Sequence, residues 1–219
     1  MARKKNITKE QLITMYMAYV MEHNDNPNSV FKFSKDNNFE ESDFYKFFSS
    51  FDHLENSIFT EFYSVTINLL HKSEDFEHYD ARNKLLSFYF TFFEVLTANR
   101  SYVVYALKAK KLNFSKLKTM SGLRTSFISF IETLDIETLD IKQERLEKLQ
   151  QKTINESAWA QLLLTLKFWL DDTSPSFEKT DIFIEKSVNA SFDIMNITPI
   201  KSVIDFGKFL FKEKIKTTS

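Results

Sequence analysis

The chain has 219 residues with 29 basic and 30 acidic side chains, and a formal net charge of −1 excludes strong overall attraction to nucleic acid. It contains two glycines and three prolines, few helix breakers for this length, and the absence of cysteine excludes disulfides and thiolate metal sites. These features predict an all-α protein that is long enough to bury a sizeable core.

The N-terminal part predicts three short helices. A capping box and an apolar stripe indicate a first helix over residues 8–23. A second helix spans residues 29–35, and the Asp-Asn-Asn sequence at 36–38 forms a tight turn, because Asn tolerates left-handed backbone angles. A third helix follows this turn, with Phe39 and Phe44 pointing inward.

The rest of the chain predicts a long connecting helix and a larger helical domain. The connector begins near Asp52, a polar loop covers residues 71–80, and the run LLSFYFTFFEVL after Ala81 indicates an enclosed helix. Further helices are expected over residues 102–110, 114–134, 139–152, 156–170 and 177–195, followed by a last amphipathic helix after Pro199. We therefore expect a head at residues 1–51 and a ligand-binding and dimerisation domain at 52–219.

The aromatic content is the main indication of a ligand site. The 24 phenylalanines exceed what close packing usually requires, so some rings can line a cavity, although such stripes are also typical of a core. The candidate ligand-binding residues are large apolar side chains of the second domain: Phe88, Tyr89, Phe92, Phe93, Tyr105, Phe127, Trp159, Leu163, Leu166 and Trp169.

Few sequence motifs indicate catalysis or metal binding. Asp75 and His78 have the spacing of a carboxylate–histidine metal pair, but a di-iron bundle needs two such motifs and only one occurs. No glycine-rich phosphate loop or arrangement of nucleophile and base is recognisable. We expect no enzyme and no cofactor. No apolar run at the N-terminus resembles a signal peptide, so we expect a cytoplasmic location.

Residues 29–56, SVFKFSKDNNFEESDFYKFFSSFDHLEN, resemble the helix-turn-helix of the TetR family of repressors. The resemblance is carried by residues at the turn, at the end of the reading helix and at the start of the connector: Asn38, Phe39, Tyr45, Phe48, Ser50 and Leu54. It implies a TetR-like fold, namely a three-helix head, a connecting helix and a ligand domain that pairs into a homodimer through its last two long helices.

The reading helix departs from this resemblance in its charge. Glu40, Glu41 and Asp43 stand where a TetR reading helix usually offers small or basic groups to phosphate, although acids at a helix start also stabilise its dipole. If the head does bind operator DNA, the contacts come from the basic arm and the reading helix: Arg3, Lys4, Lys5, Ser42, Tyr45 and Lys46.

Residues 168–188, FWLDDTSPSFEKTDIFIEKSV, resemble the ubiquinone-biosynthesis lipid-binding proteins, which share the TetR fold. This resemblance implies an isoprenoid or similar lipid as ligand, support of a partner enzyme, and a terminal helix that meets the membrane. Asp181 replaces a tryptophan of the family's partner-facing patch. The residues of the last helix that would face a membrane are Ile200, Val203, Ile204, Lys208, Phe211 and Lys212. The same stripe also suits a helix packed on the domain.

Two hypotheses follow for the function. In the first, the protein binds a lipid, acyl or isoprenoid chain in its second domain and its head has lost DNA reading, which places it in the cytoplasm or peripheral to the membrane. In the second, it is a ligand-responsive repressor whose filled pocket tilts the connecting helix and separates two reading helices. Both predict a homodimer with a hydrophobic small molecule as partner.

Overall fold

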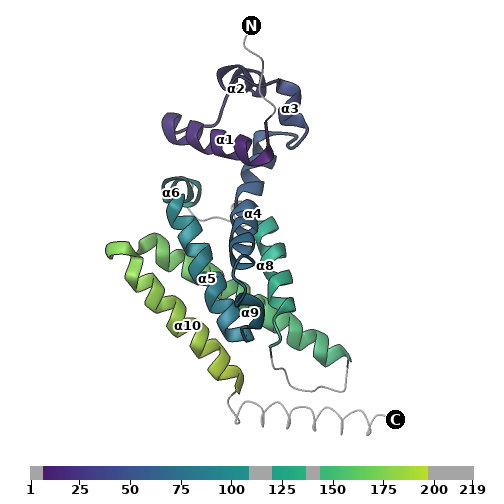
Figure 1. Cartoon of the computed structure of the whole chain (residues 1–219), viewed down its shortest axis with the longest axis vertical. Helices are drawn as coiled ribbons and strands as arrows, with labels where there is room; N and C mark the ends of the chain where they lie inside the picture. Colours follow the sequence, from purple (N-terminus) through teal and green to yellow (C-terminus); the bar gives the residue numbers. More distant parts are fainter. Residues whose placement is uncertain (1–6, 109–119, 137–143, 197–219) are drawn as a thin grey trace, which may run out of the picture. The chain divides into compact units, whose positions relative to one another are not determined.

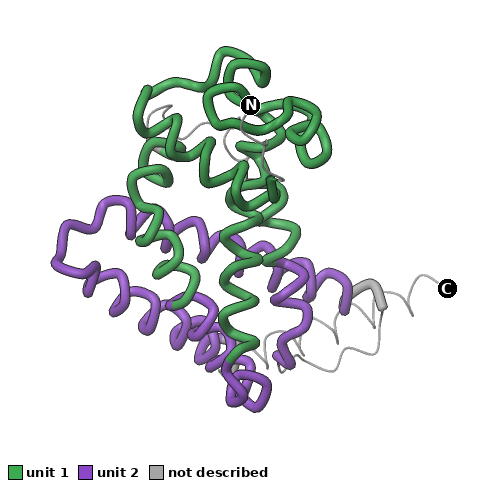
Figure 2. The backbone as a smooth tube through the Cα atoms, turned by 45° about the horizontal axis from the view of Figure 1, so that its top comes forward, with its two compact units in different colours: residues 1–72, 91–127 green, residues 73–90, 128–219 purple. Residues whose placement is uncertain are grey.

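The computed structural model describes residues 7–108, 120–136 and 144–196, and in these ranges the chain is helical without any strand (Figure 1). This agrees with the expected all-α class. The chain divides into two compact units (Figure 2): Met1–Lys72 with Thr91–Phe127, and Ser73–Phe90 with Ile128–Ser219. The functional division expected at residues 51 and 52 stays a prediction.

The head consists of α1 (Lys9–His23), α2 (Val30–Asp36) and α3 (Glu41–Tyr45). The capping box is confirmed: the Thr8 hydroxyl accepts from the Gln11 amide at 3.3 Å, and the Gln11 side chain accepts from the Thr8 amide at 3.1 Å. Ser29 caps α2, and Asn38 adopts the left-handed backbone of the predicted turn, with φ of 58°. These bounds match the predicted first two helices to within one residue.

Phenylalanine rings fill the interior of the head. The Phe51 ring lies 5.5 Å from that of Phe33 and 5.2 Å from that of Phe44, and it stacks on Tyr16 at 5.7 Å. Phe39 and Phe48 are also buried. Each ring removes a large apolar area from water, so these contacts supply much of the core of this small three-helix unit.

The same unit contains α4 (Phe51–Leu70), α6 (Arg100–Lys108) and the first half of α8 (Ser121–Thr133). Helix α4 begins at the serine cap Ser50 and is the expected connector. Gly122 of α8 lies so close to Thr60 of α4 that a Cβ at this position would collide with the Thr60 hydroxyl. Glycine leaves room for the close approach of these two helices.

The other unit contains a 3-10 turn (Phe76–His78), the start of α5 (Ala81–Ala98), α9 (Glu144–Asp171), a second 3-10 turn (Pro175–Phe177) and α10 (Glu178–Asn196). Its helices are joined by polar contacts as well as apolar ones. The Arg82 guanidinium of α5 lies 2.7 Å from an Asp193 carboxylate oxygen and 5.4 Å from the ring centre of Phe192, both on α10.

One sequence expectation for this unit differs from the structure. The separate helices expected at 139–152 and 156–170 form one continuous helix, α9, because no glycine or proline interrupts residues 144–171 and a change in polarity does not break a helix. The loop expected at 71–80 is confirmed, and its one phenylalanine, Phe76, is buried. The last expected helix, with Ile200, Val203, Ile204, Lys208, Phe211 and Lys212, lies outside the described residues.

Candidate functional site

The surface of α3 holds the reading-helix residues expected to contact DNA. Ser42, Tyr45 and Lys46 are all exposed. The polar tips of two of them meet acids of the same helix. The Tyr45 hydroxyl donates a long hydrogen bond of 3.4 Å to Glu41, and the Lys46 ammonium lies 2.6 Å from a carboxylate oxygen of Asp43. Two of the three exposed polar groups are thus paired with acids of α3.

Asp43 does not face outward as the sequence suggested. Only 9% of its surface is exposed, since it precedes the buried Phe44 on the inner side of α3 and turns toward Lys46. Glu40 is exposed and Glu41 half-buried, so two of the three acids remain near the start of the helix. The basic arm with Arg3, Lys4 and Lys5 lies outside the described residues.

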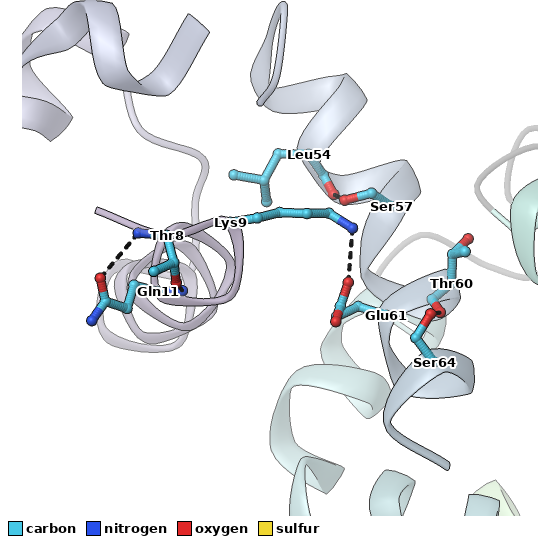
Figure 3. A network of polar contacts seen from close by, with 8 residues as sticks. All are labelled: Thr8, Lys9, Gln11, Leu54, Ser57, Thr60, Glu61 and Ser64. Carbon is cyan, nitrogen blue, oxygen red and sulfur yellow. Dashed lines mark hydrogen bonds and ion pairs between the residues drawn. The ribbon is translucent and has the colours of Figure 1, made fainter. Parts of the chain in front are cut away.

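The start of α1 is tied to the middle of α4 (Figure 3). The Lys9 ammonium lies 2.8 Å from a carboxylate oxygen of Glu61, and the Glu61 side chain is only 17% exposed. Thr60, the neighbour of Glu61, is the residue that approaches Gly122 of α8. Two consecutive residues of α4 thus contact α1 and α8 within the same compact unit.

A seam of tyrosines lies where α6 packs on α1. The Tyr16 hydroxyl donates to the Asn26 side-chain oxygen at 2.9 Å, and the Tyr105 hydroxyl donates to the Asn24 carbonyl at 3.4 Å. Tyr102 is 3% exposed, and its buried hydroxyl has no hydrogen-bond partner. Burial raises the pKa of the Tyr102 phenol, and the nearby Tyr16, Glu55 and Tyr105 raise it further.

The expected ligand-binding residues are divided between the two units. One unit holds Phe92, Phe93, Tyr105 and Phe127, and the other holds Phe88, Tyr89, Trp159, Leu163, Leu166 and Trp169. All are buried except Tyr105 and Leu163, which are half-buried. In the second unit Phe88 stacks on Phe130 with ring centres 5.0 Å apart. Tyr105 reaches toward the loop after α1, which gives it a position in the tyrosine seam.

The turn before α10 is organised by Asp172. Its carboxylate accepts four hydrogen bonds of 2.7–2.9 Å, from the backbone amides and hydroxyls of Ser174 and Thr180. Burial alone would raise the pKa of this carboxyl, but the four hydrogen bonds outweigh it and lower the pKa to about 2. Three residues of the segment 168–188 therefore bond to one another and hold this turn.

An open groove of about 460 Å³ runs between α9 and α10. Its floor is apolar: the Phe168 and Phe183 rings stack with centres 4.6 Å apart, and Ile182 is 50% exposed beside them. Lys179 and Lys186 lie along its side. Lysine and apolar residues at 179, 182, 183 and 186 share one helix face, so helical spacing could have identified the groove from sequence.

Within residues 7–108, 120–136 and 144–196, no group of three or more His, Cys, Asp or Glu side chains could hold a metal ion, and Asp75 with His78 forms no such group. None of the helices in these ranges combines the length and the apolar character needed to cross a membrane.

The tyrosine seam could not have been found from sequence. Tyr16, Glu55 and Tyr102 come from three helices separated by dozens of residues, and none of them belongs to a recognisable motif. Only the packing of α6 on α1 brings Tyr16 and Tyr102 together.

Comparison with known proteins identifies the second part of the chain. Residues 84–210, more than half of the sequence, match a family described as the tetracyclin repressor-like, C-terminal domain. No curated protein matches the chain. The all-helical fold agrees with this match, and together they support the expected TetR-like fold. The chain belongs to the family of proteins with a tetracyclin repressor-like C-terminal domain.

Proposed function

We propose that the protein binds an apolar small molecule, such as an acyl or isoprenoid chain, in its C-terminal helical domain, and that its head does not read operator DNA. The observation that supports a head without operator binding is the pairing within α3. Tyr45 and Lys46, the exposed groups suited to phosphate, are paired with Glu41 and Asp43 of the same helix. A carboxylate that faces phosphate adds a repulsion on the order of 1 kcal/mol per close pair.

The apolar ligand is supported by composition, family and resemblance. The chain has 24 phenylalanines, its family domain is of the tetracyclin repressor-like type, and proteins of the TetR family commonly bind small molecules. The likeness of residues 168–188 to lipid-binding proteins favours a long apolar chain over a compact polar ligand. Burial would stabilise such a chain by roughly 0.8 kcal/mol per methylene. Proteins of this family are typically regulators rather than enzymes, and we propose a non-enzymatic role.

The first test is native mass spectrometry of the protein as purified from cells, followed by organic extraction. A lipid or acyl chain retained at about one per subunit is the expected result. Its identification would also name the ligand class. A protein that carries no apolar molecule, and that binds none from a mixture of fatty acids and isoprenoids, would contradict the ligand half of the proposal.

A ligand-responsive repressor is the second candidate, and the exposure of Ser42, Tyr45 and Lys46 on α3 favours it. In a selection from random duplex DNA at low salt, a repressor would retain DNA, and Lys46→Glu would abolish retention. Lys72→Glu, at an exposed lysine after α4, is the matched charge-reversal control. Retention by the parent protein that is lost only in the Lys46 variant would overturn our proposal for the head.

We also propose a homodimer and a peripheral membrane contact. Proteins of this family commonly form dimers, and the apolar groove between α9 and α10 is suited to receive a second copy. The sequence of residues 200–214 combines an apolar face with lysines, as in helices that lie on anionic lipid. Deletion after Thr198 should reduce binding to anionic liposomes. Unchanged binding would exclude this segment as the membrane contact.

A further inference from the structure

The head exposes aromatic side chains on α2, on α3 and in the turn that follows α3. Phe31 of α2 is 64% exposed, Tyr45 at the end of α3 is 53% exposed, and Phe47, two residues later, is 38% exposed. Within the described ranges, the other exposed aromatic residues are Tyr79 and Phe90. Helices α2 and α3 pack on each other, so this small part of the chain carries three of these five rings.

Core packing does not explain these rings. The interior of the head is already filled by Phe33, Phe39, Phe44 and Phe48, each at most 2% exposed. A single exposed apolar residue is ordinary, but several exposed aromatic residues on two packed helices and the turn after them are typical of a binding surface, where aromatic side chains are enriched.

The charge of the head restricts what can bind to these rings. Residues 7–56 contain four lysines and nine acidic residues, a net charge of −5. The basic arm adds Arg3, Lys4 and Lys5 and still leaves residues 1–56 at −2. Lys32 and Lys35 on α2 are exposed, but Lys46 is held by Asp43. The formal net charge of the head is therefore negative.

Like charge disfavours three classes of partner. Nucleic acid and an anionic membrane surface would both be repelled by a negative head, and a second copy of the same head carries the same charge. A cationic partner with apolar side chains would gain from both features of the surface, because opposite charge speeds encounter and buried aromatic anchors hold the complex.

We propose that the head is a protein-docking surface, centred on Phe31, Tyr45 and Phe47, which receives a basic amphipathic segment of another protein. This inference rests on the proposed function, since it requires that the head does not read DNA. The helix-turn-helix then supplies a rigid frame for a protein contact, and the ligand domain and the docking surface belong to one carrier or adaptor.

The test uses the full-length protein and a fluorescent synthetic amphipathic peptide of lysine and leucine, with binding followed by anisotropy. A glutamate–leucine peptide of the same pattern controls for apolar binding without charge. The lysine–leucine peptide should bind with an affinity that falls as salt is added. The triple variant Phe31→Ser, Tyr45→Ser, Phe47→Ser should bind it at least about tenfold more weakly, as expected when interface anchors are removed.

A matched triple variant removes exposed apolar residues elsewhere: Leu69→Ser, Tyr79→Ser and Ile194→Ser, exposed by 40–54% in the parent. It should bind the peptide as the parent does. If the two triple variants bind equally, the inference is wrong. Should the head variant fail to fold by circular dichroism, Glu40→Lys with Glu41→Lys replaces it. This double variant should also weaken peptide binding, and unchanged binding overturns the inference.

A random-sequence duplex DNA is the second probe at the same salt. DNA binding that is lost on Lys46→Glu would overturn the proposed function, and the docking inference with it. Binding of neither the DNA nor the lysine–leucine peptide would overturn the docking inference alone and leave the proposed function standing. Peptide binding that depends on the three rings, without DNA binding, supports both.

Discussion

The buried hydroxyl of Tyr102 destabilises the folded state, and removing its oxygen should relieve this cost. Its hydroxyl is buried between α6 and α1 without a hydrogen-bond partner, whereas the neighbouring Tyr16 hydroxyl is bonded to Asn26. An unsatisfied buried donor costs roughly 1–3 kcal/mol, because it has lost water and gained nothing. Tyr102→Phe should therefore raise the free energy of unfolding, by about 1 kcal/mol after partial relaxation.

Tyr16→Phe is the matched control in the same seam. It removes the 2.9 Å hydrogen bond from the Tyr16 hydroxyl to Asn26, so it should lower the free energy of unfolding by about 1 kcal/mol. Urea unfolding followed by circular dichroism measures both changes. If Tyr102→Phe destabilises the protein as Tyr16→Phe does, the Tyr102 hydroxyl has a partner in solution and the prediction is wrong.

Asp172 should contribute stability that depends on pH. Its four hydrogen bonds hold the folded-state pKa at about 2, below the ordinary value of 3.8. A group with a depressed folded pKa stabilises fully above its unfolded pKa and loses this contribution as pH falls toward the folded value. Near neutral pH, Asp172→Asn should lower the free energy of unfolding by about 1–2 kcal/mol, as loss of a helix-capping acceptor does.

The difference between the parent and this variant should shrink as pH falls from about 4 to about 2, which urea unfolding at several pH values measures. Asp171→Asn is the neighbouring control, because Asp171 is exposed and its contact with Lys167 at 3.0 Å is a surface ion pair. It should change stability by less than about 1 kcal/mol. A constant difference across this pH range would show that the Asp172 carboxylate is not the responsible group.

At the scale of helices, Gly122 sets how closely α8 approaches α4. A Cβ there would collide with the Thr60 hydroxyl, so Gly122→Ala should destabilise the protein by about 1–3 kcal/mol, the usual cost of overpacking. The effect should reverse in a Thr60→Ala background, where the collision is gone and alanine gains up to about 1 kcal/mol of helix propensity over glycine.

A double-mutant cycle of these two positions, measured by urea unfolding, isolates the contact. Ser126→Ala, farther along α8 and half-buried, is the control that should not couple to Thr60→Ala. Additive effects of Gly122→Ala and Thr60→Ala would mean that the helices separate freely at this point. The close approach would then not be fixed by glycine.

The predictability of the elements follows from how local their causes are. The start of α1 and the turn at Asn38 were predicted, because a capping box and a left-handed asparagine act within a few residues. The continuity of α9 was not, since the shift from charged to apolar residues near Glu156 imitates a boundary. The pairing of Asp43 with Lys46 was missed, because spacing alone does not tell which side of a five-residue helix is buried.

The candidate site was less predictable than the fold because its parts come from distant segments. Aromatic density identified side chains that are mostly buried, but it could not tell which compact unit each would join. The sequence did not predict that Phe31 and Phe47 are exposed, since they and the buried Phe44 are the same residue type in similar sequence surroundings. Exposure, which decides between core and docking surface, exists only in the folded chain.

At the scale of the whole molecule, the groove between α9 and α10 predicts self-association. Leu164 is 57% exposed and Ile182 is 50% exposed, and both lie beside the stacked Phe168 and Phe183. A second copy of the chain would remove this apolar surface from water. Leu164→Glu with Ile182→Glu should convert a dimer into a folded monomer, because burying two unpaired carboxylates at an interface is costly and neither residue belongs to the core.

Size-exclusion chromatography with light scattering gives the mass of the parent protein and of this double variant. Ile194→Glu, at an equally exposed position of α10 outside the groove, should leave the dimer intact. If the parent protein is a monomer at high concentration, this dimer does not form. If the double variant keeps a dimeric parent's mass, the dimer contact lies elsewhere.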